Sequence, residues 1–180
     1  MRFSLFLILP ALLIAVTSGC AAMPFTDEAK ARNLMENVSQ FYKTDAIIRA
    51  GGVEMRAHIY RPDPMTSKAE LLYPERVAGF VYSFREGGIE LSFQGLSFNL
   101  DSYGGTRSAP IPRAVGALSS LLLPQAERPL PSRQNGFWVL SGEFAGEERL
   151  LFLDEEGLPV KLLLQSPEVE FVFENFVFLG

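Results

Sequence analysis

The sequence predicts an α+β domain in which two helices cover a strongly curved antiparallel β-sheet. Short runs that alternate between apolar and polar residues follow one another, separated by glycine or proline turns, as in the hairpins of a meander. Only two stretches have the three- and four-residue apolar spacing of an amphipathic helix, one near the N-terminus and one in mid-chain. A curved sheet has to bury its concave face, and these two helices are the available covers.

The first 19 residues have the pattern of an export signal. Arg2 precedes an apolar run from Leu5 to Val16, which is too short to span a bilayer. Small residues then lead directly into Cys20, the only cysteine of the chain. The resulting segment, Thr17-Ser18-Gly19-Cys20, resembles the lipobox of bacterial lipoproteins, in which the cysteine is lipidated and becomes the mature N-terminus.

This resemblance divides the chain into three parts. Residues 1–19 are expected to be a lipoprotein signal peptide, residues 20–25 a lipidated tether, and residues 26–180 the folded domain. Acyl chains on Cys20 then hold the domain on the outer face of a bacterial membrane. The alternative is ordinary secretory cleavage after Ala21 or Ala22, which leaves no lipid.

The predicted domain starts with a helix and continues with strands. Asp27 and Glu28 suit the N-terminal end of a helix dipole, and the apolar spacing that follows predicts a helix over residues 27–40. A turn at Gly51-Gly52 joins strands at 42–49 and 53–60. Further strands are expected at 68–73, 80–85, 89–94 and 96–101, and then at 137–144, 148–153, 159–165 and 169–178. In the hairpin of 80–85 with 89–94, the alternation predicts that Phe80, Tyr82 and Phe84 are matched on the partner strand by Ile89, Leu91 and Phe93.

The mid-chain helix separates these two groups of strands. Apolar spacing predicts it over Ala114 to Leu122, with Pro112 in its first turn and an end before Pro124. Val115, Leu118 and Leu122 share one face, so we expect this helix to be the lid of the curved sheet. The prolines between residues 124 and 133 indicate an extended connection.

Composition excludes several classes of protein. The chain has 180 residues, a net charge of −5, one cysteine and one histidine. One Cys and one His cannot form a Cys/His zinc site, and a catalytic triad would have to use His58. An acidic chain lacks the basic surface of a general nucleic-acid binder. We therefore expect a protein that is not an enzyme and has no cofactor, no metal site and no nucleic-acid partner.

Two polar features leave alternatives open. His58 shares a strand face with Glu54, Arg56 and Tyr60, which predicts a small charged binding patch or a general base, or else a solvated face with a cross-strand ion pair. The acidic residues between Glu143 and Glu174 would attract Ca²⁺ or a basic partner, or simply keep turns and strand faces soluble. They lack the spacing of an EF-hand loop.

Several short motifs, taken in order along the chain, resemble the LolA/LolB-like lipoprotein superfamily. They are Val38-Ser-Gln-Phe41-Tyr42, Leu72-Tyr73-Pro74-Glu75-Arg76, Phe93-Gln94-Gly95-Leu96-Ser97-Phe98, Phe152-Leu153-Asp154 and Gly157-Leu158-Pro159. The Gly-Leu-Ser-Phe strand and the Gly-Leu-Pro turn look most like the clostridial GerS-type germination lipoproteins. The superfamily fold is an incomplete β-barrel whose mouth is lidded by helices over an apolar cavity.

The resemblance implies two functions. The GerS-type likeness implies a protein that binds or stabilises an envelope enzyme, with a spore cortex-modifying, cell-wall amidase type of partner. The LolA/LolB likeness implies a carrier or receptor of lipid acyl chains. A part-open barrel has room for a cavity, and most of the aromatic side chains otherwise fill the core. The candidate lining residues are Phe80, Tyr82, Phe84, Leu91, Phe93, Phe98 and Trp138.

Overall fold

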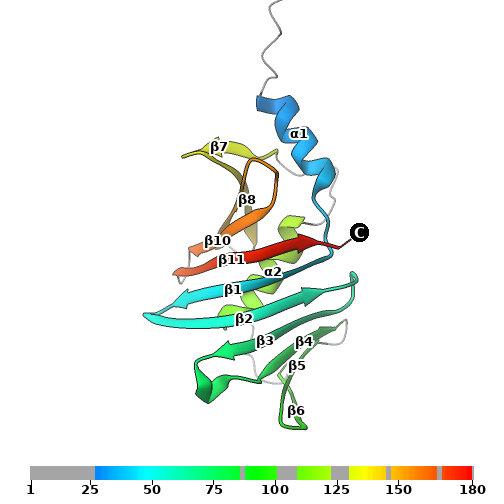
Figure 1. Cartoon of the computed structure of the whole chain (residues 1–180), viewed down its shortest axis with the longest axis vertical. Helices are drawn as coiled ribbons and strands as arrows, with labels where there is room; N and C mark the ends of the chain where they lie inside the picture. The colour runs from blue at the N-terminus through cyan, green and yellow to red at the C-terminus, as the bar shows by residue number, and fades with distance from the viewer. Residues whose placement is uncertain are drawn as a thin grey trace, which may run out of the picture.

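Eleven antiparallel strands form one open sheet in the computed structural model, which describes residues 27–85, 88–100, 109–122, 130–144, 147–165 and 168–179. The strand order is β6-β5-β4-β3-β2-β1-β11-β10-β9-β8-β7. Figure 1 shows the sheet along the long axis of the molecule, with β6 at one end and β7 at the other. This confirms the predicted α+β curved sheet. The predicted signal peptide, Cys20 and the predicted tether lie outside the described residues.

The strand bounds agree with the predicted runs to within a few residues. The first group comprises β1 (Tyr42–Ala50), β2 (Val53–Arg61), β3 (Ser67–Tyr73), β4 (Val81–Arg85), β5 (Gly88–Phe93) and β6 (Leu96–Asn99). The second group comprises β7 (Ser132–Gln134), β8 (Phe137–Phe144), β9 (Glu147–Leu153), β10 (Pro159–Gln165) and β11 (Glu168–Phe178). A short 3-10 helix, η1 (Glu75–Val77), connects β3 to β4.

One strand, β7, was not predicted. Its three residues lie in and just beyond the segment expected to be an extended connection, and they are too few to show an alternating pattern. The turn that joins β7 to β8 is Asn135-Gly136, with positive φ angles of 50° and 86°. Asn-Gly is the pair that a tight two-residue hairpin turn favours, so the sequence did contain a local signal for this hairpin.

The centre of the sheet joins two groups of strands that are distant in the sequence. β1 pairs with its sequence neighbour β2 on one side and with β11 on the other, where Tyr42 lies opposite Phe178. The hydroxyl of Thr44 donates a hydrogen bond to the backbone oxygen of Glu174 at 3.0 Å. Every other strand pair among the described residues joins neighbours in the sequence, so β1 and β11 form the strand pairing that connects the two halves of the sheet.

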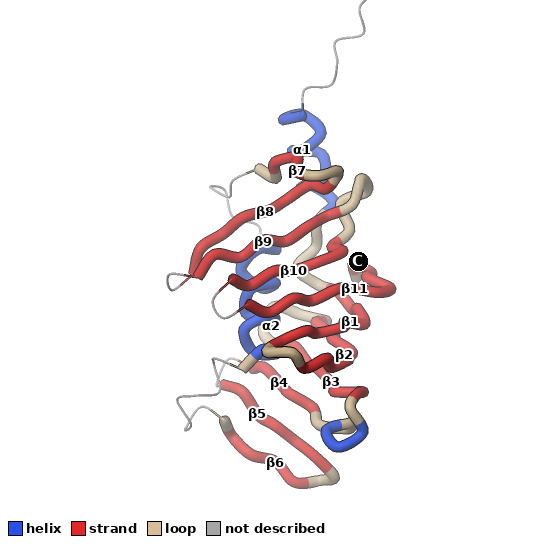
Figure 2. The backbone as a smooth tube through the Cα atoms, turned by 90° about the vertical axis from the view of Figure 1, so that its left-hand side faces the viewer, coloured by secondary structure: helices blue, strands red, loops and turns tan. Residues whose placement is uncertain are grey.

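The two helices lie on the sheet in different ways. α1 (Asp27–Asn37) ends three residues before the predicted boundary at residue 40 and lies at the β7 end. α2 (Pro110–Leu122) begins four residues before the predicted start at Ala114. Figure 2 shows α2 running along one face of the middle strands. Neither described helix has the length and apolar character needed to cross a membrane.

The core lies between α2 and the inner face of the sheet. In β1, Tyr42, Ala46 and Ile48 are buried, while the alternate residues Lys43 and Arg49 are exposed. The same alternation continues through β9, β10 and β11, where the buried members include Leu151, Leu162 and Phe171. This period of two places one apolar face of each strand against the helix, as expected for an antiparallel sheet with one covered face.

Candidate binding surface

The candidate site is the inner face of the outermost strands β4, β5 and β6. In this part of the sheet each strand pairs with its neighbour in the sequence, β4 with β5 and β5 with β6. β4 pairs with β5 so that Tyr82 lies opposite Leu91 and Phe84 opposite Ile89, which confirms the facing residues predicted for this hairpin. Gln94 and Gly95 form the turn between β5 and β6, with φ angles of 48° and 83°, which fix the register of the last strand.

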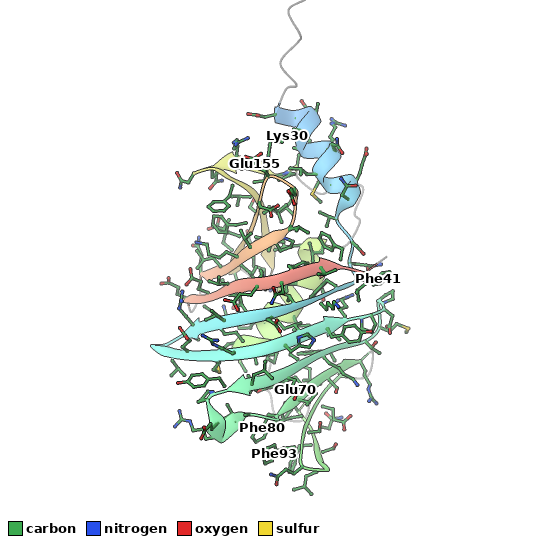
Figure 3. The ribbon with its side chains drawn as sticks, in the orientation of Figure 1. Lys30, Phe41, Glu70, Phe80, Phe93 and Glu155 are labelled. Atoms are coloured by element: carbon green, nitrogen blue, oxygen red, sulfur yellow. The ribbon has the colours of Figure 1, made fainter. Side chains whose placement is uncertain are left out.

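Apolar side chains cover this face in rows that run across the strands. We call them the aromatic floor; they are Phe80, Tyr82, Phe84, Ile89, Leu91, Phe93, Leu96 and Phe98. The rings of Phe80 and Phe93 stack with centroids 4.3 Å apart, and Figure 3 shows them close together at the β6 end. Leu91 lies opposite Phe98, and Phe93 lies opposite Leu96. The floor continues the inner face of β3, because Ala69, which is fully buried, lies opposite Tyr82.

Exposure rises across the aromatic floor from the core towards the edge of the sheet. Phe80, Tyr82 and Phe84 are half-buried and pack against the hydrophobic core, and burial raises the pKa of the Tyr82 hydroxyl. At the edge, Leu96 is 62% exposed and Phe98 is 53% exposed. Large apolar side chains at such exposure, continuous with a buried apolar face, are typical of a surface that another molecule covers.

Six of the seven predicted lining residues lie together in the aromatic floor. The seventh, Trp138, lies in β8 near the opposite end of the sheet and is only 1% exposed. Lys30 of α1 and Arg133 of β7 lie over its ring, at 5.8 and 5.6 Å from the centroid. Both cations also form ion pairs with Glu155. Trp138 therefore belongs to the contact that holds α1 on the sheet, and it is not brought together with the other six.

The predicted lid face of α2 is buried against the sheet. Val115, Leu118 and Leu122 are 2%, 0% and 1% exposed. The helix comes so close to β8 that a Cβ atom at Gly142 would lie 2.9 Å from Leu121 Cδ2. The side chains beneath α2 thus pack as core, whereas the aromatic floor lies on strands beyond this contact (Figure 2).

Arginines from both halves of the sheet reach the polar side of α2. Arg61 of β2 donates a hydrogen bond to Ser119, and Arg149 of β9 donates one to Ser120 at 3.3 Å. Both arginines are buried, and burial lowers the pKa of Arg149. Sequence reasoning missed them, because arginine is mostly an exposed residue type, although both arginines stand at the alternate positions that are buried in their strands.

His58 forms a cross-strand pair, as one of the two predicted alternatives states. Its Nδ1 lies 2.8 Å from Oδ1 of Asp45 on β1, and both side chains are 40% or more exposed. Hydrogen bonds from His58 and then from Asn175 lower the pKa of Asp45.

The acidic residues of the second half are distributed over several local contacts. Asp154 accepts backbone hydrogen bonds within its own turn, from Glu156 and Leu158 at 2.9 Å. Glu170 pairs with Arg49 at 2.9 Å and with Lys161 at 3.8 Å. Among the described residues, no three His, Cys, Asp or Glu side chains gather as a metal site would require.

Comparisons with known proteins found similarity at the level of structure. No protein-family model matches the chain, and no curated protein sequence matches it. An uncharacterized conserved protein of Thermus thermophilus aligns with a TM-score of 0.48 and 16% identity, over 86% of this chain and 88% of that chain. A LolA superfamily protein of Nitrosomonas europaea aligns with a TM-score of 0.44 and 11% identity, over 83% and 94%.

A third similar structure is the MucA/MucB complex of Pseudomonas aeruginosa. It aligns with a TM-score of 0.42 and 17% identity, over 86% of this chain and 58% of the matched chain. The solved structures therefore include a member of the superfamily that the sequence resembles. At these identities and TM-scores the likeness carries no conclusion about function, and the closeness to GerS-type lipoproteins stays a prediction.

Proposed function

We propose that this chain is an exported bacterial lipoprotein, anchored through Cys20 to the outer face of a membrane, that binds an envelope protein and catalyses no reaction. The observation that supports partner binding is the aromatic floor. Its apolar side chains continue the core out to β6, where Leu96 and Phe98 are more than half exposed. An apolar surface of this kind supplies binding energy when a partner removes it from water.

Packing beneath α2 favours a binding platform over a carrier. A carrier of acyl chains needs an internal space between its lid and its sheet. Here Ala114, Ala117 and Leu118 of the helix are fully buried, as are Ile48 and Leu162 of the sheet. These side chains occupy the region beneath the lid, so the apolar surface available to another molecule lies at the β4 to β6 end.

The kind of partner follows from the sequence resemblance alone. The Gly-Leu-Ser-Phe strand is β6 with its preceding glycine, and the Gly-Leu-Pro turn leads into β10. Through its likeness to GerS-type lipoproteins, we propose a cell-wall amidase type of enzyme that modifies the spore cortex. The alternative function is a carrier or receptor of acyl chains, which is favoured by one observation: the exposed rings of the aromatic floor would also suit a lipid chain.

Metabolic labelling with an alkyne fatty acid tests the anchor. The wild-type protein should take up the label, and Cys20→Ala should not, because Cys20 is the only thiol in the chain. An unlabelled wild-type protein, or a label that survives the substitution, would show that the anchor is wrong.

Affinity capture of the tagged, lipidated protein from its own cells tests the binding surface. Leu96→Ser removes an exposed apolar side chain from the aromatic floor, and Leu72→Ser removes one from the opposite face of β3, where Leu72 is 49% exposed. The partner should be lost with Leu96→Ser and retained with Leu72→Ser. Equal recovery with both variants would contradict the assignment of the surface.

Native mass spectrometry separates the two candidate functions. After expression in a lipid-containing host, a binding platform should give the mass of the chain alone. Lipid at near-stoichiometric occupancy, reduced by Phe98→Ser, would favour the acyl carrier instead.

A further inference from the structure

The two edges of the open sheet differ in how well they are protected. β7 forms one edge, with three residues that include Arg133, and Pro131 directly precedes it. The ion pair of Arg133 with Glu155 also links this edge to α1 through Lys30. Short length, charge, a flanking proline and a covering helix are the usual devices that prevent a sheet edge from pairing with another chain.

The β6 edge is also short, but it has neither charge nor proline within its own residues. Leu96–Asn99 contains no charged residue and no proline, and all four residues are exposed. Leu96 and Phe98 point to the inner face with the aromatic floor, while Ser97 points to the outer face. In the part of the chain that the structure describes, no strand pairs with the outer side of β6.

The backbone register identifies which groups face this open side. The N–H of Leu100 donates to the carbonyl oxygen of Ile89 at 2.8 Å, so Leu100 and, by alternation, Phe98 and Leu96 direct their backbone groups towards β5. Ser97 lies at the alternate position, between Leu96 and Phe98. Its N–H and C=O therefore point away from β5, at the middle of the edge, where an added strand would need a donor and an acceptor.

We propose that β6 accepts an extended segment of the partner protein as a twelfth strand. Backbone groups of the segment pair with Ser97, and its apolar side chains, at every second residue, lie beside Leu96 and Phe98 at the end of the aromatic floor. Main-chain hydrogen bonds then supply affinity, and the alternate side chains supply specificity. This proposal rests on the proposed function, because it describes how the partner is bound.

Three other occupants fit the edge less well. The residues after Leu100, Asp-Ser-Tyr-Gly-Gly-Thr-Arg-Ser, contain one aromatic residue and lack alternating apolar positions. A second copy of the chain would meet this edge over only four residues, whereas stable interfaces use about 20 to 30 residues on each side. An extended segment needs no such area.

The anchoring membrane is the third occupant that fits less well. Residues 20–26 reach about 25 Å when fully extended, and they lead into α1, at the β7 end of the sheet. Ten strand spacings of about 4.8 Å separate β7 from β6 along the sheet. An anchor at Cys20, as proposed above, would therefore be at the end of the molecule that is farthest from the proposed edge.

Selection from a phage-displayed library of random 12-residue peptides tests the proposal on the full lipidated chain in detergent. Enriched peptides should have apolar residues at every second position. Binding should weaken at least tenfold with Ser97→Pro, which removes the outward N–H but no hydrogen bond to β5. Ser97→Ala keeps this N–H and should bind like the wild type.

A second variant keeps the test valid if Ser97→Pro does not fold, as judged by thermal melting. Phe98→Lys places a charge on the aromatic floor at the edge and should also weaken peptide binding at least tenfold. Peptides with apolar residues at three- and four-residue spacing, unchanged binding to both variants, or no enrichment at all would overturn the proposal. So would a dimer in sedimentation that Ser97→Pro abolishes, because a second copy would then be the occupant.

These experiments distinguish a failure of the proposed strand addition from a failure of the proposed function. If fatty-acid labelling of Cys20 fails while alternating peptides bind and Ser97→Pro abolishes binding, the anchor is wrong and the strand addition stands. If labelling succeeds and Leu96→Ser loses the partner while Ser97→Pro retains it, only the strand addition is wrong.

Discussion

The substitution Leu118→Ala tests whether α2 is part of the hydrophobic core or a cover over open space. Leu118 is fully buried on the face that packs against the sheet. Removing about three methylene-sized groups costs roughly 2.4 kcal/mol in transfer free energy, and a cavity adds to this cost. Strands on one side and a continuous helix on the other limit how far the site can collapse, so we expect a loss of about 3 to 5 kcal/mol. The melting temperature should fall by on the order of 10 °C.

Urea denaturation followed by tryptophan fluorescence measures this loss directly. Trp138 is the only tryptophan, and its burial makes it sensitive to unfolding. Leu118→Met should cost less than about 1.5 kcal/mol because it conserves volume. Leu130→Ala, at a side chain that is 39% exposed, is a surface control. A loss below about 1 kcal/mol for Leu118→Ala would refute the packing argument and leave a lid over open space, in which case ligand or partner binding should suffer. If Leu118→Ala changed neither the free energy of unfolding nor binding, α2 would be neither core nor lid.

Three further predictions follow from local geometry. Gly116→Ala should raise the free energy of unfolding by about 0.5 to 1 kcal/mol in urea melts, because Gly116 is an exposed interior position of α2, with open space where the Cβ would lie. A loss of stability would contradict this. Gly157→Ala should destabilise the protein by at least about 1 kcal/mol in thermal melts, because Gly157 has a φ of +88° and its Cβ would approach Leu34 of α1 to 3.2 Å. Unchanged melting and unchanged proteolysis of α1 would argue against this contact. Asp45→Asn should lower stability by less than about 1 kcal/mol at pH 6. The hydrogen bond with His58 lowers the pKa of Asp45 in the folded state, so its contribution is present above the unfolded pKa of about 3.9 and is lost as pH falls through the lower folded value. Urea melts from pH 6 to pH 3 should therefore converge for wild type and variant, and a gap that widens with acid would contradict the assignment.

Local pattern was sufficient to predict the hairpins. In β4 and β5, alternating apolar residues and a glycine turn defined both strands and the residues that face one another, and the structure confirms Tyr82 opposite Leu91. The same alternation singled out six residues of the aromatic floor. Leu96 could have been included by the same reasoning, because it lies opposite Phe93 across the tight turn at Gln94 and Gly95.

Features that depend on contacts between distant parts of the chain could not be predicted from the local sequence pattern. Trp138 is a large aromatic residue of the kind expected to line an apolar cavity, yet it lies under α1. Only the strand order places β8, which contains Trp138, away from Phe93 of β5. Arg61 and Arg149 are buried because α2 crosses strands from both halves and offers them serine hydroxyls. An alternating pattern indicates which residues share one face of a strand, but it does not indicate which element packs on that face.

The seam between β1 and β11 also has a consequence for the order of folding. Thr44 and Glu174, which are bonded across it, lie 130 residues apart, so the pairing of β1 with β11 carries the largest loop-closure cost in the sheet. The hairpins on either side can form as soon as their own residues are available, whereas the seam has to wait for β11. The two halves would therefore acquire structure separately, with the pairing edges of β1 and β11 exposed until they meet. Non-local pairing of this kind makes folding slow. The interval before the seam closes is the time when this chain is most open to aggregation, chaperones and proteases.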